Sequence, residues 1–274
     1  MFSRYCFILR IFSLRDKYLM TPNFLEIFIL ALIQGISEFL PVSSSAHLFL
    51  ISEIHEFRSQ SLLTDIGLHL GSLLAIIIYF RNEIKNIFHN KNLILLIVFG
   101  SIPLIIVGTI IYISGFINHF RNLEVIAWMT LIFGLILYFA DKFEVKKKIE
   151  TDLKIKSILL IGLFQILALI PGVSRSGIVI TAARFLNFSR YDSTKISFYL
   201  SIPAIAGASF LGLKDLVNEN INFNIIILVS IILSFIFSYL TIKYFLIYTK
   251  KFSLKFFVIY RIILSIIIFS IIYY

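Results

Sequence analysis

Two short polar segments interrupt stretches of the chain that are otherwise almost wholly apolar. The first is PVSSSAH, from Pro41 to His47, and the second is PGVSRSG, from Pro171 to Gly177. Each follows an apolar helical stretch and leads into another, so its hydroxyl, imidazole and guanidinium groups are expected at membrane depth. Polar groups are costly in hydrocarbon and persist there where they line a polar cavity or do chemistry. These two segments are therefore the candidate functional site.

A carboxylate comes just before the first polar segment. Gln34 and Glu38 are four residues apart, which puts them on one face of a helix. A carboxylate at membrane depth needs a cation, a proton or a basic partner. A structural pair with a loop lysine is the alternative. We expect Glu38, with Gln34, to bind a divalent metal ion or to belong to a phosphate site.

The first polar segment itself supplies hydroxyls and an imidazole. Ser43, Ser44 and Ser45 precede a predicted helix, whose N-terminus can bind an anion. A serine before a helix is also a common N-cap, which is the simpler interpretation. His47 is either a packing histidine or, beside Glu38 and the serines, a candidate for acid–base chemistry.

Arg175 is the most informative residue of the second segment. A guanidinium inside an apolar hairpin has few uses except binding an anion, and its planar fork matches phosphate oxygens. An arginine paired with Glu38 for structure alone is the alternative. Gly172 and Gly177 let the backbone approach a ligand closely. The remaining candidate substrate-binding hydroxyls are those of Ser174 and Ser176.

Two weaker signals lie elsewhere. Asp65 and His69 have the i, i+4 spacing of a metal pair, but a packing pair has the same spacing, and both interpretations stay open. Arg184 and Arg190 are expected to be topological anchors at the membrane interface.

The composition indicates an integral membrane protein. The chain has 274 residues, of which 59% are hydrophobic and 15% charged, and its mean hydropathy is +0.96. Soluble domains are nearer 45–50% apolar and about 25% charged. The net charge of +10 lies mostly in short loops, which favours the positive-inside pattern over nucleic-acid binding. The one cysteine, Cys6, excludes an intrachain disulfide and a cysteine-based metal cluster.

The apolar pattern predicts an all-α polytopic membrane protein with six transmembrane helices. We expect them at residues 62–80, 93–114, 122–140, 196–213, 222–247 and 253–273. Proline-led turns divide two shorter pairs, 24–40 with 46–54 and 157–170 with 178–187, which we interpret as re-entrant helical hairpins. Residues 1–20 are expected to be a basic extension, and Met20 could be the true start of the protein. Residues 21–274 are expected to form a single domain.

Loop charges predict the orientation. Basic connections at 81–91, 141–156 and 250–255 belong in the cytoplasm, and all six spans then alternate without conflict. The first hairpin then enters from outside and the second from the cytoplasmic side, so their polar turns point towards each other. Inverted-topology repeats with broken helices that meet near the midplane are an architecture of transporters. The converging carboxylate, amide, hydroxyls, imidazole and guanidinium indicate a phosphate site, and a lipid phosphate is its natural ligand in a membrane.

At these residues the chain resembles the undecaprenyl-diphosphate phosphatase family, the bacitracin-resistance proteins of bacteria. That family has an (E/Q)xxxE segment followed by a PxSSxxH-like turn, here Gln34 to His47, and a PGxSRSG signature, here Pro171 to Gly177. The similarity covers about residues 22–274. Many relatives have glutamate where this chain has Gln34, which puts in doubt a metal site built on two carboxylates.

The resemblance implies the fold, the reaction and the cofactor. It implies hydrolysis of undecaprenyl diphosphate to undecaprenyl phosphate and inorganic phosphate, which recycles the lipid carrier of peptidoglycan synthesis and confers bacitracin resistance. It also implies a divalent cation, Mg²⁺ with Ca²⁺ as the alternative, and a location in the bacterial inner membrane with the site facing outwards. A homodimer stays open as an assembly state.

Our hypothesis for the mechanism assigns roles to four residues. Arg175 and the turn backbones hold the diphosphate, and the metal ion bridges to Glu38. Ser44 is either the nucleophile, activated by His47, or a phosphate ligand while water attacks. The alternative function is a prenyl-phosphate lipid transporter or flippase, since inverted repeats suit alternating access equally well.

Overall fold

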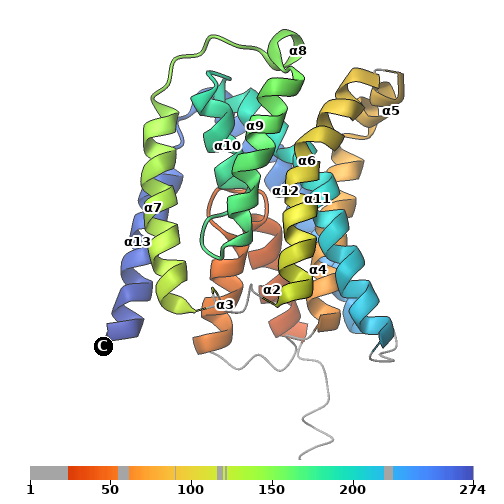
Figure 1. Cartoon of the computed structure of the whole chain (residues 1–274). Helices are drawn as coiled ribbons and strands as arrows, with labels where there is room; N and C mark the ends of the chain where they lie inside the picture. Colours follow the sequence, from red (N-terminus) through yellow and green to blue (C-terminus); the bar gives the residue numbers. More distant parts are fainter. Residues whose placement is uncertain are drawn as a thin grey trace, which may run out of the picture.

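A computed structural model shows a bundle of helices that run roughly along one direction (Figure 1). It describes residues 24–54, 62–89, 91–115, 120, 122–218 and 225–273. The predicted basic extension at 1–20 lies outside these residues. The described helices are α2 (Phe24–Ser37), α3 (Ser44–Ile54), α4 (Leu62–Tyr79), α5 (Arg81–His89), α6 (Lys91–Ser114), α7 (Leu123–Asp141), α8 (Ile149–Asp152), α9 (Ile155–Gln165), the 3₁₀ turn η2 (Ile166–Leu169), α10 (Arg175–Phe185), α11 (Arg190–Asn218), α12 (Ile225–Lys251) and α13 (Lys255–Tyr273).

Helices long and apolar enough to span a bilayer confirm a polytopic membrane protein. Within the described residues there are five of them, in α6, α7, α11, α12 and α13. The predicted span at 62–80 corresponds to α4, which is apolar but shorter than these five. The segment 81–91, interpreted from sequence as a loop, contains α5. Apolar Ile84 packs against the main core cluster while Arg81 and Lys85 are exposed, so this helix has one apolar face.

Two helix pairs approach each other end to end inside the bundle. We call α2 with α3 the first pair and α9–η2 with α10 the second pair. Figure 1 shows the first pair in the lower half and the second in the upper half, with their connecting turns meeting in the middle. The first turn comprises residues 38–43 and the second comprises residues 170–174. The arrangement brings the two polar segments together although they are far apart in sequence.

Small residues let the surrounding helices pack closely. On α4, a Cβ added to Gly71 would collide with the carbonyl oxygen of Ile231 on α12. Ser72 on α4 lies 3.1 Å from Ser234 Oγ and 3.0 Å from Ser238 Oγ, both on α12. Small residues and interhelical hydroxyl bonds are how helices associate in lipid, where the hydrophobic effect is absent. This contact fixes α4, which carries His69, against the rest of the bundle.

The basic connections gather at one end of the bundle, which we call the basic end. Figure 1 shows α5 and α8 together at the top, opposite the C-terminus. Asp141 at the end of α7 binds Arg190 of α11, with its Oδ1 2.6 Å from Arg190 Nε, and accepts the Leu254 N–H before α13. Clustering of the basic connections on one side agrees with the alternation predicted from their charges.

Candidate active site

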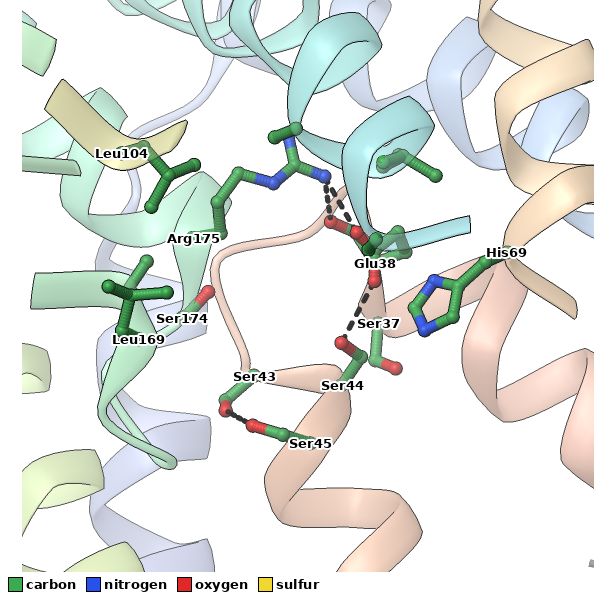
Figure 2. A pocket seen from close by; sticks show the side chains of 14 residues that line it. Ser37, Glu38, Ser43, Ser44, Ser45, His69, Leu104, Leu169, Ser174 and Arg175 are labelled. Carbon is green, nitrogen blue, oxygen red and sulfur yellow. Dashed lines mark hydrogen bonds and ion pairs between the residues drawn. The ribbon is translucent and has the colours of Figure 1, made fainter. Parts of the chain in front are cut away.

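A polar cavity of about 220 Å³ lies where the two turns meet. Glu38, Ser43, Ser44, Ser45, Ser174 and Arg175, all predicted from the sequence, line it together with Ser37 and His69. Its other walls are apolar side chains of α6, η2 and α11, namely Leu104, Ala168, Leu169, Ala204, Ile205 and Ala208. Figure 2 shows the polar groups converging on this space from several helices.

The Glu38 carboxylate is the centre of the hydrogen-bond network. Its Oε1 accepts from Arg175 Nη2 at 2.7 Å. Its Oε2 accepts from Ser44 Oγ at 2.9 Å and from Gln34 Nε2 at 3.0 Å. The Glu38 and Arg175 side chains are only 9% and 13% exposed, so this ion pair is shielded from bulk solvent. Both the carboxylate and the guanidinium are therefore held at the cavity wall, beside the Ser44 hydroxyl.

The two turns have the same local geometry. Ser43 and Ser174 both have left-handed backbones, with φ of 75° and 72°. In each turn the hydroxyl of that serine lies 3.2 Å from the hydroxyl two residues later, in Ser45 and in Ser176. The correspondence places Ser44 and Arg175 in equivalent positions, each as the first residue of a helix. Two helix N-termini thus reach one cavity, which favours an anion there.

Arg261 of α13 joins the two turns from behind. Its side chain is fully buried. It donates to the carbonyls of Gly172 at 2.9 Å and Val173 at 3.0 Å in the second turn, and to Pro41 at 3.4 Å in the first. Sequence interpretation missed this residue, because it lies in an apolar stretch far from both polar segments. The signal was available, since a lone arginine in a spanning helix usually faces the bundle interior.

His47 does not line the cavity. Its Nδ1 is 2.6 Å from the carbonyl oxygen of Ser43, so Nδ1 carries the proton and donates. Its Nε2 is 2.5 Å from the hydroxyl of Tyr260, which stacks on the imidazole ring. No hydrogen bond joins His47 to Ser44 among the described residues. His47 therefore contacts the backbone of the first turn, and the side chain that accepts the hydrogen bond of the Ser44 hydroxyl is Glu38.

Three further predicted residues lie behind the turns. Gly172 has φ of 93°, and a Cβ there would come within 2.6 Å of the Ile126 carbonyl oxygen. Gly177 leaves room for Arg261, whose Nη1 would be 3.1 Å from an added Cβ. Ser176 donates to the Leu40 carbonyl at 2.6 Å, which ties the second helix pair to the first turn. These residues shape the backbone, and none of them lines the cavity.

Comparison with known proteins gives the family. The family model described as bacitracin resistance protein BacA matches residues 27–267. The chain belongs to this family. An undecaprenyl-diphosphatase of Pelagibacter ubique strain HTCC1062 is 59% identical over 202 residues, which cover 73% of this chain and 79% of that protein. A protein with the same name from Saccharophagus degradans is 43% identical over 207 residues, which cover 70% of this chain and 77% of that protein. Another from Elusimicrobium minutum is 45% identical over 203 residues, which cover 71% of this chain and 78% of that protein.

For this BacA family member, the structure also settles where the weaker sequence signals lie. His69 lines the cavity beside Glu38, whereas Asp65, four residues earlier, does not. Arg184 is buried near the basic end and donates to the carbonyl oxygens of Phe188, Asp141 and Phe143. Arg190 binds the Asp141 carboxylate at the same end. Both arginines therefore lie at the basic end, where the sequence predicted topological anchors.

Proposed function

We propose that this BacA family member is an undecaprenyl-diphosphatase, which hydrolyses undecaprenyl diphosphate to undecaprenyl phosphate and inorganic phosphate. The observation that carries the proposal is the joint cavity of the two turns. There a buried Arg175–Glu38 pair lies beside the Ser44 hydroxyl and two helix N-termini. Relatives that bear this name support the same reaction. Neither the site nor these relatives favour the lipid-transporter alternative.

The reaction we propose uses Ser44 as the nucleophile. Its Oγ attacks the terminal phosphorus while the Ser44 proton passes to Glu38, 2.9 Å away. The bond from that phosphorus to the bridging oxygen breaks, and undecaprenyl phosphate leaves. Water then attacks the phosphoserine, and the bond from phosphorus to Ser44 Oγ breaks as Glu38 returns its proton to that oxygen. Inorganic phosphate leaves with the oxygen and the protons of the water, which restores the Ser44 hydroxyl and the Glu38 carboxylate. Arg175 neutralises the charge that develops on the phosphoryl oxygens.

The donor set fits a divalent cation that keeps most of its water. Among the described residues, no group of three or more His, Cys, Asp or Glu side chains could hold a metal ion. Gln34 Oε1, however, is buried and has no hydrogen-bond partner there, and Glu38 supplies one carboxylate. Mg²⁺ typically takes one or two carboxylates plus substrate phosphates and water. Glu38 and Gln34 would hold Mg²⁺ or Ca²⁺, which would offset diphosphate charge.

The membrane arrangement we propose follows the sequence expectation. Six spans, with α4 as the shortest, surround two re-entrant hairpins related by inverted topology. The basic end faces the cytoplasm of a bacterial inner membrane, and the cavity opens outwards. The prenyl chain lies among the apolar helices that surround the cavity. A homodimer remains a proposal for the assembly.

Phosphate release from undecaprenyl diphosphate by the purified protein in detergent tests the proposed function. We expect release in Mg²⁺, loss in EDTA, and a rate at least about 100-fold lower in Arg175→Ala, since one strong anion donor contributes about 2–4 kcal/mol to the transition state. Lys146→Ala, an exposed change at the basic end, is the matched control with unchanged turnover. A folded wild-type protein that releases no phosphate with any divalent cation would contradict the proposal.

A further inference from the structure

His69 enters the cavity from a helix outside both helix pairs. It belongs to α4, whereas Glu38 follows α2, Ser44 begins α3 and Arg175 begins α10. Figure 2 shows its imidazole on the side of Glu38 opposite Arg175, with the ring edge turned towards the cavity. It is the histidine that lines this cavity, since the other one considered from sequence, His47, packs against Tyr260.

Gln34 fixes the proton position on His69. Gln34 Nε2 is 3.0 Å from a Glu38 carboxylate oxygen, which only accepts, so this atom must be the amide nitrogen. The same nitrogen is 3.2 Å from His69 Nδ1. An amide NH₂ group has two protons and can donate to both atoms. Nδ1 therefore accepts, and the proton of the neutral imidazole lies on Nε2.

A histidine held in this tautomer is a donor. Its Nδ1 lone pair is engaged by the amide, and a second proton on Nδ1 would face the Gln34 N–H group. Its Nε2 has no hydrogen-bond partner among the described residues and belongs to a side chain that lines the cavity. The Ser44 hydroxyl already donates to Glu38, so the network does not need a second proton acceptor there.

We propose that His69 is a catalytic residue that donates a hydrogen bond from Nε2–H to a phosphoryl oxygen in the cavity. This inference rests on the proposed function and assigns His69 a role distinct from that of a general base. The oxygen it contacts lies across the cavity from Arg175, so the phosphoryl group is held between a guanidinium and an imidazole. The ligand is a phosphoric anhydride or phosphate ester.

Two substitutions at His69 distinguish a hydrogen-bond donor from a general base. The side-chain nitrogen of glutamine can occupy the position of Nε2, whereas that of asparagine reaches only as far as Nδ1. His69→Asn is expected to lower kcat/KM for undecaprenyl diphosphate about ten- to hundredfold, the loss of one hydrogen bond to a charged group. His69→Gln keeps a donor and is expected to stay within about threefold of wild type. A His69→Gln protein as inactive as His69→Asn would overturn the donor role.

His47 provides the matched control, because the activities of its Asn and Gln variants are expected to rank in the opposite order. Its Nδ1 donates to the Ser43 carbonyl, so His47→Asn preserves that bond and His47→Gln loses it. We expect His47→Asn to be the more active of the two. If the Gln variant were the more active one at both histidines, the assigned roles of their nitrogens would be contradicted, because activity would then follow residue size rather than the position of the nitrogen. The unfolding temperature of each variant in detergent shows that the compared proteins are folded.

A binding measurement keeps this inference separate from the proposed function. Isothermal titration of inorganic pyrophosphate, with Mg²⁺ present and in a Ser44→Ala background that removes the proposed nucleophile, reports contacts to phosphoryl oxygens without turnover. We expect the affinity of His69→Asn to be about tenfold weaker than that of His69→Gln. If wild type releases no phosphate, the proposed function fails while this comparison still tests His69. Equal pyrophosphate affinities for the two variants would overturn the contact to phosphate.

Discussion

One carboxylate organises the site at the scale of single residues. Glu38 accepts hydrogen bonds from Arg175, Ser44 and Gln34, and Gln34 in turn reaches His69. Each of these side chains comes from a different helix, or from the turn that joins two helices. A buried charge of this kind persists only when it is paired and hydrogen-bonded. The network therefore explains why so many polar groups are retained within an apolar chain.

Ser44→Ala tests the nucleophile. Removing the hydroxyl is expected to lower kcat at least about 100-fold and to abolish a phosphoserine intermediate. Acid quench of wild type with substrate labelled in its terminal phosphate, followed by peptide mass spectrometry, should locate the label on Ser44. Ser45→Ala, whose hydroxyl contacts Ser43 instead of Glu38, should still form the intermediate. Substantial turnover by Ser44→Ala without labelled protein would favour direct attack by water.

Residue types predicted part of this network and packing decided the rest. Glu38, Ser44 and Arg175 were identifiable because polar groups inside apolar stretches are rare. The roles of the two histidines could not be assigned this way. His47 follows the serines in sequence, but the direction of α3 turns its ring towards Tyr260. His69 reaches the cavity from α4, which packs closely on α12 through Gly71 and Ser72, and the sequence does not show that packing.

At the scale of elements, one arginine holds the two turns together. Arg261 binds backbone carbonyls on both turns, and on α7 it binds Thr130 O at 3.1 Å and Met129 O at 3.3 Å. A guanidinium offers five donors in a fixed plane, whereas an ammonium offers a compact group of three. Lysine at this position would retain the charge but leave buried carbonyls without partners.

Arg261→Lys tests this contribution. We expect a loss of stability of about 1–3 kcal/mol from unsatisfied carbonyls, and a kcat about 100-fold lower because reacting groups shift by about an ångström. Thermal unfolding and turnover per folded molecule measure the two effects. Arg184→Lys is the control, since Arg184 is also buried and also binds carbonyls, but at the basic end. Equal turnover in the two variants would show that Arg261 has no special effect on the site.

The helix pairs were more predictable than the contacts between them. Proline in both polar segments, together with glycine in the second, predicted broken helices, and the structure has turns at both. The sequence could not show that η2 follows α9, because an apolar stretch gives no local signal for a 3₁₀ turn. Nor could it show the shared left-handed serines, since that backbone conformation is uncommon outside glycine and is imposed by the surrounding fold.

At the scale of the whole molecule, charge asymmetry predicts the orientation in the membrane. The exposed lysines after α7 and before α13 belong to the same end as α5. This asymmetry was visible in the sequence because loops between apolar spans are short and their charges can be counted. The cavity lies where the two turns meet, between the two ends of the bundle.

Cysteine labelling in intact cells tests the orientation. In a background with Cys6→Ser, we expect Ser114→Cys to react with an impermeant maleimide and Lys146→Cys to react only after lysis. Ser114 ends α6 opposite the basic end, while Lys146 is exposed at the basic end. Labelling of Lys146→Cys in intact cells, with Ser114→Cys protected, would reverse the proposed topology.

The most direct test of a single site shared by both turns is a double-mutant cycle. The values of kcat/KM for undecaprenyl diphosphate would be measured for wild type, Glu38→Gln, Arg175→Ala and the double variant. Since the two side chains are in contact at 2.7 Å and act on one phosphoryl group, the double variant should lose little more than the worse single variant. Losses that simply add would mean that the two turns act independently, and would contradict the shared site.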